Sequence, residues 1–304
     1  MYQGRHTDTK HRFNPILTVV LILFIGVFCF SGYKLASELI RARNENNAFM
    51  ELAEIKRQAQ SEVNSQTPRD TIDASGMKRE EPADNPNPEQ IIPDHLNEPI
   101  NEPEEPIEEQ LPEYQPIYEM NPDYFGWLTI EGTAFDYPVV FTPEQPERYL
   151  HLAFDGTYSN SGVPFLDGNW SGNENYFLIY GHNMKNGTMF GQLLPYMDPA
   201  YQREHPIIQF DTLYVRHSYE VMAVFLTKVY YTDEEYQNAF RYYEYLDLAD
   251  EQTFAEYIRE VKKAAMYDTG VDAKFGDSIL VLSTCNYHTE DGRFVVVARE
   301  CKTE

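Results

Sequence analysis

An uncharged run of apolar residues near the start of the chain limits how everything after it can fold. Residues 15–33 read PILTVVLILFIGVFCFSGY. As a helix, ~19 residues rising ~1.5 Å each cover nearly all of the ~30 Å hydrocarbon core of a bilayer. The run is long for the apolar part of a signal peptide, and no small-x-small cleavage site follows before the charged residues 34–43. We therefore expect one retained transmembrane helix, with a cleaved signal peptide as the weaker alternative.

The sidedness of this helix does not follow from its flanking charges. Three basic residues precede the apolar run and three follow it closely, so the positive-inside rule gives a tie. We expect residues 1–14 in the cytoplasm and the remainder of the chain outside the membrane, because the chemistry argued below operates there.

Two segments of contrasting composition follow the apolar run. Residues 34–63 place apolar side chains roughly on one helical stripe, which predicts a juxtamembrane helix, with a weakly packed stalk as the alternative. Residues 64–116 are rich in Pro, Glu, Asn and Asp and contain near-repeats such as NEPINEPEEPIEE. Such a segment cannot bury enough surface to offset its ordering entropy. We expect a disordered, acidic, proline-rich linker that acts as a spacer.

The charge of the chain is concentrated in this linker. The formal net charge is -25, and between Glu80 and Glu113 there are twelve acidic residues and no Lys or Arg. A surface of this sign repels phosphate backbones, so nucleic acid is not expected among the partners.

The composition changes near residue 117, and residues 117–304 have the length of one domain. Short runs rich in β-branched and aromatic residues, such as YFLIY, SILVLST and RFVVVAR, alternate with turn signals. This pattern predicts a mostly β fold, an antiparallel barrel or sandwich. One helix of about four turns is expected after an N-cap at Asp250, just upstream of the run that ends in LSTC.

Three residues of this domain could perform covalent cysteine catalysis. Cys285 ends a β-rich run, Arg293 opens the next, and His182 follows the run YFLIY in a glycine-containing turn. A thiolate is a nucleophile, an imidazole can transfer its proton, and a fixed guanidinium charge can stabilise an oxyanion together with a backbone N–H such as that of Asn286. His288 is the rival base.

The placement of the other cysteines and the absence of metal-binding motifs argue against other cysteine chemistries. Cys29 lies in the apolar run, and a bridge between Cys285 and Cys301 would consume the proposed nucleophile, so a disulfide framework is not expected. Cys301 has little chain beyond it to build an active-site wall, and we expect it to be a structural thiol. Papain-like enzymes place the cysteine before the histidine, whereas here His182 precedes Cys285. The sequence contains no CxxC, CxxH or HExxH motif and no glycine-rich phosphate loop, so we expect neither a metal nor another cofactor.

The motifs YGHNM, LSTC and RFVVVAR, preceded by NPDYFGWLTIEGTAFDYPVVF and SGVPFLD, resemble those of the class B sortases. The similarity extends over roughly residues 117–298. The resemblance implies an eight-stranded sortase barrel with accessory helices. Cys285 matches the family's nucleophile, His182 its acid/base and Arg293 its oxyanion or substrate-binding arginine. Thr284 and Asn286, beside the cysteine, are expected to bind substrate, although many class B members carry an acidic residue in place of Asn286.

The resemblance also implies an activity and partners. Sortases cleave a C-terminal sorting signal after threonine, hold the acyl fragment as a thioester and pass it to an amine. The partners would be surface proteins of a Gram-positive cell that bear such a signal, and an acceptor amine on a peptidoglycan precursor or on a pilin. The catalytic domain would lie outside the cell, anchored by the single membrane helix.

Three alternatives remain at this point. A pilin-polymerising sortase would differ only in its acceptor. A non-enzymatic membrane-anchored adhesin would share the anchor, linker and β domain. An L,D-transpeptidase would also pair histidine with cysteine, but the serine-x-glycine-cysteine pattern of that family is absent.

Overall fold

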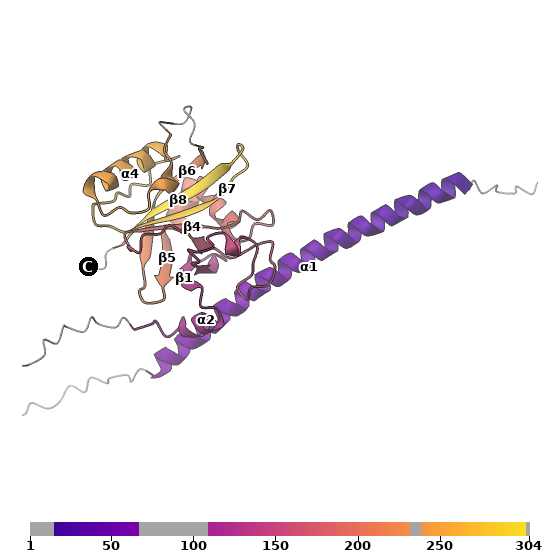
Figure 1. The fold of residues 1–304 in the computed structure, drawn as a ribbon, viewed down its shortest axis with the longest axis horizontal. Helices are drawn as coiled ribbons and strands as arrows, with labels where there is room; N and C mark the ends of the chain where they lie inside the picture. The colour runs from indigo at the N-terminus through magenta and orange to yellow at the C-terminus, as the bar shows by residue number, and fades with distance from the viewer. Residues whose placement is uncertain (1–14, 67–108, 232–236, 238, 302–304) are drawn as a thin grey trace, which may run out of the picture.

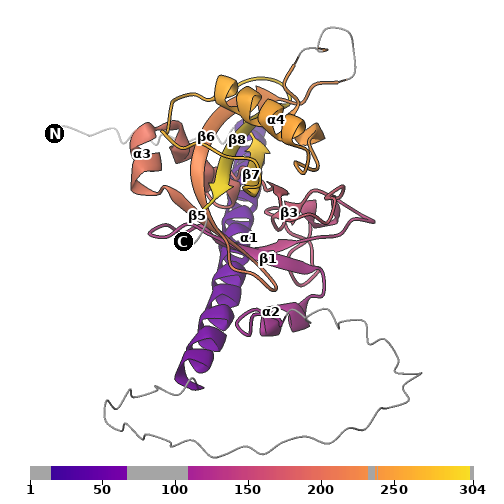
Figure 2. The ribbon, with the colours of Figure 1, turned by 90° about the vertical axis from the view of Figure 1, so that its left-hand side faces the viewer.

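The computed structural model describes residues 15–66, 109–231, 237 and 239–301 (Figures 1 and 2). The predicted cytoplasmic residues 1–14 and most of the predicted linker, residues 67–108, lie outside this range. The α-helices are α1 (Pro15–Gln66), α2 (Gln115–Met120), α3 (Pro199–Glu204) and α4 (Glu251–Ala264). Short 3-10 helices are η1 (Arg148–Leu150), η2 (Phe190–Met197) and η4 (Tyr242–Glu244). The strands are β1 (Tyr124–Thr129), β2 (Asp136–Val140), β3 (Phe165–Leu166), β4 (Tyr176–Tyr180), β5 (Ile207–Thr212), β6 (Ser218–Lys228), β7 (Ile279–Cys285) and β8 (Gly292–Glu300).

The strands close into a barrel in the order β1-β2-β3-β4-β7-β8-β6-β5, and β5 pairs back with β1. Most neighbouring strands are antiparallel, but β2 with β3 and β4 with β7 run parallel. The predicted mostly β fold with an eight-stranded barrel is confirmed.

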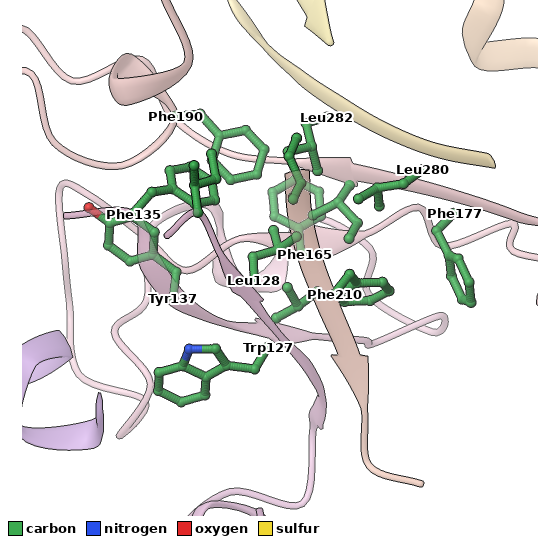
Figure 3. Packing of buried hydrophobic residues seen from close by; sticks show 14 of the residues in the cluster. Trp127, Leu128, Phe135, Tyr137, Phe165, Phe177, Phe190, Phe210, Leu280 and Leu282 are labelled. Atoms are coloured by element: carbon green, nitrogen blue, oxygen red, sulfur yellow. The ribbon is translucent and has the colours of Figure 1, made fainter. Parts of the chain in front are cut away.

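Strands β7 and β8 are apolar on both faces because each face has its own cover. In β7, Leu280 and Leu282 join the cluster inside the barrel, shown in Figure 3. The alternate residues Ile279 and Val281 pack in a second cluster with α4 on the outside of the barrel. The run ILVL within SILVLST is therefore apolar at every position because both faces of the strand are buried. Successive side chains still point to opposite faces.

Helix α4 is the outer cover of this part of the barrel. It begins at the predicted N-cap, where the Asp250 carboxylate accepts a hydrogen bond from the Thr253 N–H at 2.8 Å. Its buried residues recur at helical spacing and face the second cluster; they are Phe254, Tyr257, Ile258 and Val261. The helix expected upstream of the cysteine strand is confirmed.

Helix α1 is one unbroken helix of 52 residues, which covers both the run predicted to cross a membrane and the predicted juxtamembrane helix. Among the described residues it is the one helix long and apolar enough to cross a membrane, with a mean hydropathy of 2.2 in its most apolar window and none of that window buried. Figure 1 shows the N-terminal half of α1 extending away from the barrel, while its C-terminal half passes alongside.

The C-terminal half of α1 packs against the barrel. Phe49, Leu52 and Ala53 are buried in the same cluster as the barrel interior. The ring of Phe49 meets the ring of Tyr137 in β2 edge to face, with 5.2 Å between centroids. This part of α1 is therefore a component of the folded domain and not the weakly packed stalk considered as an alternative.

A partly buried ion pair adds to this packing. Lys56 Nζ lies 2.7 Å from Asp136 Oδ1, and it also lies 4.2 Å from the centroid of the Trp127 ring. Trp127 Nε1 donates to the same carboxylate oxygen at 2.5 Å. Burial lowers the pKa of Lys56, and Asp136 opposes that effect. Asp136 thus accepts from three donors, one from α1 and two from β1, since the Thr129 hydroxyl also donates to it at 3.3 Å.

The described residues on either side of the predicted acidic linker belong to α1 and to the segment that leads into α2. Helix α1 continues through residues 64–66, which were predicted to belong to the linker, and ends at Gln66. At the far end of the linker, the Leu111 N–H donates to the Leu213 carbonyl at 2.8 Å, and Tyr114 is buried against the barrel. Helix α1 contacts the barrel through residues that precede the linker, so α1 and the barrel meet without the linker between them. The role of residues 64–116 as a spacer remains a prediction, because most of them lie outside the described residues.

We expect Asp136→Ala to destabilise the full chain by about 3 kcal/mol, because it leaves Lys56 partly buried without its counter-charge. The carboxylate is partly exposed, so we expect a loss of unfolding free energy at the low end of the range for broken buried ion pairs. Lys56→Met removes the charge but keeps an apolar stem, and should cost about 1 kcal/mol or less. Urea denaturation followed by the fluorescence of the two tryptophans measures both. Equal losses would show that the ion pair does not hold α1.

Candidate active site

The ends of three adjacent strands bring the predicted catalytic residues together. Strand β4 pairs in parallel with β7, with Tyr180 opposite Ser283, so the residues that follow each strand leave the barrel at the same edge. Strand β8 pairs antiparallel with β7, with Arg293 directly opposite Cys285. His182 follows β4 by two residues, at the edge where β7 ends in Cys285.

Strand alternation determines which face of the barrel these side chains use. Leu280 and Leu282 point into the barrel, so the odd-numbered residues of β7 point outward, toward the side that α4 covers. Cys285 is odd-numbered and exposed. Its opposite neighbour Arg293 shares that face, as directly paired antiparallel residues do. The site is therefore on the outside of the barrel, where the cover provided by α4 ends.

These side chains line one cleft of about 490 Å³. Its wall includes His182, Cys285 and Arg293. The rest of the lining is mainly apolar and aromatic, with a few polar groups, and includes Pro146, Leu150, Phe165, Asp167, Tyr180, Val229, Tyr242 and Tyr243. An extended peptide with apolar side chains fits such a groove.

The imidazole of His182 is held by a backbone carbonyl. Its Nε2 lies 2.8 Å from the oxygen of Leu150. A carbonyl oxygen can only accept, so Nε2 carries a hydrogen in this contact. In the neutral ring, Nδ1 is then the nitrogen that can take up and release a proton. The ring also stacks on that of His151, with 5.5 Å between centroids and 27° between planes.

Two hydrogen bonds join the His182 turn to β7. The Asn183 amide Nδ2 donates to the carbonyl of Cys285 at 2.9 Å. The hydroxyl of Thr284, whose side chain is buried, donates to the carbonyl of Gly181 at 2.7 Å. Thr284 thus contributes an interstrand bond beside the cleft, and its predicted contact with substrate remains a prediction.

Arg293 is placed at the rim by the turn that joins β7 and β8. Its Nη1 donates to the carbonyls of Gly292 at 3.0 Å and Asp291 at 3.3 Å. The guanidinium side chain is half-buried. Two donor bonds to its own turn leave most of the five N–H groups of a guanidinium for a ligand.

Two tyrosines that line the cleft were not identified from the sequence. Tyr242 forms a hydrogen bond of 2.6 Å with Ser283, and burial raises the pKa of Tyr242 to about 12. Tyr180 donates to Asp167 at 2.9 Å, and burial with that nearby carboxylate raises its pKa well above the usual value. Both phenols therefore stay neutral and act as hydrogen-bonding groups. Only Tyr180 carried a signal in the sequence, because it ends the run YFLIY two residues before His182.

The structure changes the expectations for the turn after Cys285. The backbone N–H of Asn286 donates to the carbonyl of Gly292 at 2.9 Å, so it is already used and is not the oxyanion donor suggested from the sequence. The Asn286 side chain accepts a hydrogen bond from the His288 N–H and contacts that imidazole, each at 3.0 Å. His288 is exposed on this outer turn and is not among the residues that line the cleft.

Cys301 lies at the opposite end of β8 from Arg293, ~27 Å away for eight residues of strand. Burial raises the pKa of its thiol, which disfavours the thiolate. Among the described residues, no group of three His, Cys, Asp or Glu side chains is placed to hold a metal ion.

Comparisons with known proteins point to one family. A family model described as a sortase domain matches residues 128–301. Sortase B of Listeria monocytogenes is 32% identical over 187 residues, which cover 59% of this chain and 70% of that protein. Sortase B of Staphylococcus aureus is 29% identical over 193 residues, which cover 62% of this chain and 75% of that protein.

Solved structures agree with the sequence comparisons. The X-ray structure of Clostridium perfringens sortase B is 26% identical with a TM-score of 0.54, over 62% of this chain and 98% of that chain. A Staphylococcus aureus sortase B–substrate complex is 26% identical with a TM-score of 0.54, over 65% of this chain and 88% of that chain. Family, curated relatives and fold thus favour an enzyme over the adhesin that the sequence left open. The chain belongs to the class B sortases, which are cysteine transpeptidases.

Proposed function

We propose that this chain is a membrane-anchored transpeptidase that cleaves a C-terminal sorting signal through a thioester on Cys285 and transfers the acyl fragment to an amine of the cell wall. The observation that carries the proposal is the convergence of His182, Cys285 and Arg293 on one cleft at the ends of three adjacent strands. One face of the barrel thereby offers a nucleophile, a proton carrier and a fixed positive charge.

In the first half-reaction, the Cys285 sulfur gives its proton to Nδ1 of His182 and attacks the carbonyl carbon of the scissile peptide bond. The resulting oxyanion is tetrahedral and negatively charged. When it collapses, the carbon–nitrogen bond breaks and the imidazolium returns the proton to the departing amine. The acyl fragment remains on sulfur as a thioester.

In the second half-reaction, an acceptor amine attacks the thioester carbonyl and gives a proton to His182. The carbon–sulfur bond then breaks, and the sulfur leaves as a thiolate that takes the proton back. A new amide replaces the old one, so the reaction needs no cofactor and no net change in protonation. The same two residues thus act in reverse order in the two halves.

Arg293 supplies the positive charge for the oxyanion or for substrate carbonyls. A guanidinium stays protonated at any relevant pH, so it cannot be the base. Its position opposite Cys285 in the register favours a place near the carbonyl under attack. Because the Asn286 N–H already donates to the Gly292 carbonyl, the Arg293 charge contributes more of the oxyanion stabilisation than we expected from the sequence.

Cys285→Ala should abolish both cleavage of a sorting peptide and formation of the acyl adduct, because no neighbouring group replaces the sulfur. Cys301→Ala is the matched control and should leave both nearly intact. Intact-mass analysis after incubation with the peptide measures the adduct. An adduct that persists in Cys285→Ala would show that the nucleophile is assigned wrongly.

Arg293→Ala should lower kcat and kcat/KM together by ~10²-fold or more, the scale seen when an oxyanion donor is removed. Arg293→Lys keeps the charge without the planar fork and should recover only part of the loss. Steady-state kinetics on one sorting peptide measures both variants. A raised KM with kcat kept would assign Arg293 to substrate binding alone, and wild-type kinetics would remove it from the site.

We further propose that residues 15–33 cross the membrane and that the catalytic domain lies outside. Protease added to protoplasts should then cut the acidic linker. Because α1 packs on the barrel through Phe49, Leu52 and Lys56, the cut domain should stay on the membrane and leave it only under denaturing conditions. Gel analysis of the membrane and soluble fractions checks this. A linker protected from protease would reverse the orientation, and immediate release would show that α1 does not hold the domain.

A further inference from the structure

One loop lies between the juxtamembrane half of α1 and the imidazole of the active site. This loop, residues 148–163, follows β2 and leads into β3. At one side, the Leu150 carbonyl accepts the hydrogen bond from His182 Nε2 at 2.8 Å, and His151 stacks on the same imidazole. These are the contacts that fix the orientation of the His182 ring.

The other side of the loop is held by two glutamates of α1: Glu38 accepts from the Asn160 side-chain amide at 3.3 Å, and Glu45 makes the shorter bonds. Glu45 Oε1 accepts a hydrogen bond from the Asn160 N–H at 2.8 Å, and Oε2 accepts one from the Ser161 hydroxyl at 2.5 Å. Both partners are more than 110 residues away in sequence. Hydrogen bonds to a carboxylate are about twice as strong as neutral ones.

The loop is cross-linked, so its two sides move together. The Ser159 N–H donates to the His151 carbonyl, and the Val163 N–H donates to the Tyr149 carbonyl, each at 3.0 Å. The buried Ser159 hydroxyl oxygen accepts from the N–H groups of Ser161 and Gly162, each at 3.1 Å. The part of the loop that Glu45 holds is therefore bonded to the part that carries Leu150.

A close approach of backbone to backbone within the loop lies beside the carbonyl that binds His182. Gly162 has a φ of +59°, and a Cβ there would come within 2.6 Å of the Leu150 oxygen and 2.5 Å of the Tyr149 oxygen. No side chain fits at such distances, so these two stretches of backbone touch directly. A displacement of residues 160–162 would press on, or withdraw from, the Leu150 carbonyl.

We propose that Glu45 is a positioning residue for His182: through Asn160 and Ser161 it fixes the loop whose Leu150 carbonyl orients the imidazole. The inference rests on the proposed role of His182 in acyl transfer. Proton transfer needs Nδ1 at hydrogen-bonding distance from the reacting atoms, and a ring that loses its Nε2 partner can turn away. Glu45 itself is not among the residues that line the cleft.

The test uses the full chain in detergent micelles and three matched variants. Glu45→Ala removes both acceptors and should lower kcat by about 10-fold or more with KM little changed, because ring orientation matters for proton transfer more than for peptide binding. Glu45→Gln keeps an oxygen for the Asn160 N–H and should recover part of the loss. Glu54→Ala is the control, because Glu54 is an exposed glutamate of α1 whose partners Arg57 and Gln58 belong to the same helix.

A spectroscopic readout separates positioning from general loss of stability. In histidine labelled with ¹⁵N, two-bond ¹⁵N–¹H correlations report which ring nitrogen carries the hydrogen. The chain has eight histidines, and His182→Gln assigns the signal of interest. In the wild type, His182 should show its hydrogen on Nε2. In Glu45→Ala that signal should shift toward a mixture of tautomers, while Glu54→Ala leaves it unchanged.

Ser161→Ala provides a milder second variant that leaves α1 untouched. It should lower kcat less than Glu45→Ala, and the double variant should be no slower than Glu45→Ala alone, because the two residues act through one contact. Wild-type kcat with an unchanged His182 signal in Glu45→Ala would overturn the inference, as would strictly additive effects. If His182→Gln keeps acyl transfer, the proposed function fails instead, and the His182 signal still reports separately whether Glu45 orients the ring.

Discussion

The parallel pairing of β4 with β7 is the contact on which the candidate site depends. It joins segments more than 100 residues apart and sets Tyr180 opposite Ser283. Since side chains alternate with a period of two, a slip of one residue would turn either His182 or Cys285 to the other face of the sheet. The bonds that Asn183 and Thr284 make across the strand ends fix the register where the strands diverge.

The extent of helix α4 on the outside of the barrel explains why the site is exposed at Cys285. Helix α4 buries the outward residues of β7 and β8 along most of their length, but Cys285 lies beyond its end and is exposed. Ser283 precedes Cys285 on the same outer face of β7, and it is already buried and hydrogen-bonded to Tyr242. Cys285 therefore lies at the boundary between a packed apolar layer and solvent.

The sequence predicted the parts of this arrangement that local patterns encode. The β-rich runs, the N-cap at Asp250 and the motifs around His182, Cys285 and Arg293 each lie within a few residues, and the resemblance supplied the barrel. Apart from bringing His182 and Cys285 into one site, it did not predict contacts between distant segments. The bond from Ser161 to Glu45 crosses 116 residues, and no local pattern marks either partner. The use of the Asn286 N–H by Gly292 depends on how the turn after Cys285 closes, which turn residues alone do not determine.

Helix α1 links the membrane question to the chemistry. Glu45 follows the end of the apolar run by twelve residues, so ~18 Å of continuous helix separates the two. A straight helix transmits position far better than a proline-rich chain of the same length. If residues 15–33 lie in a bilayer, the cleft is held at a set height above it by the same helix that fixes the loop behind His182.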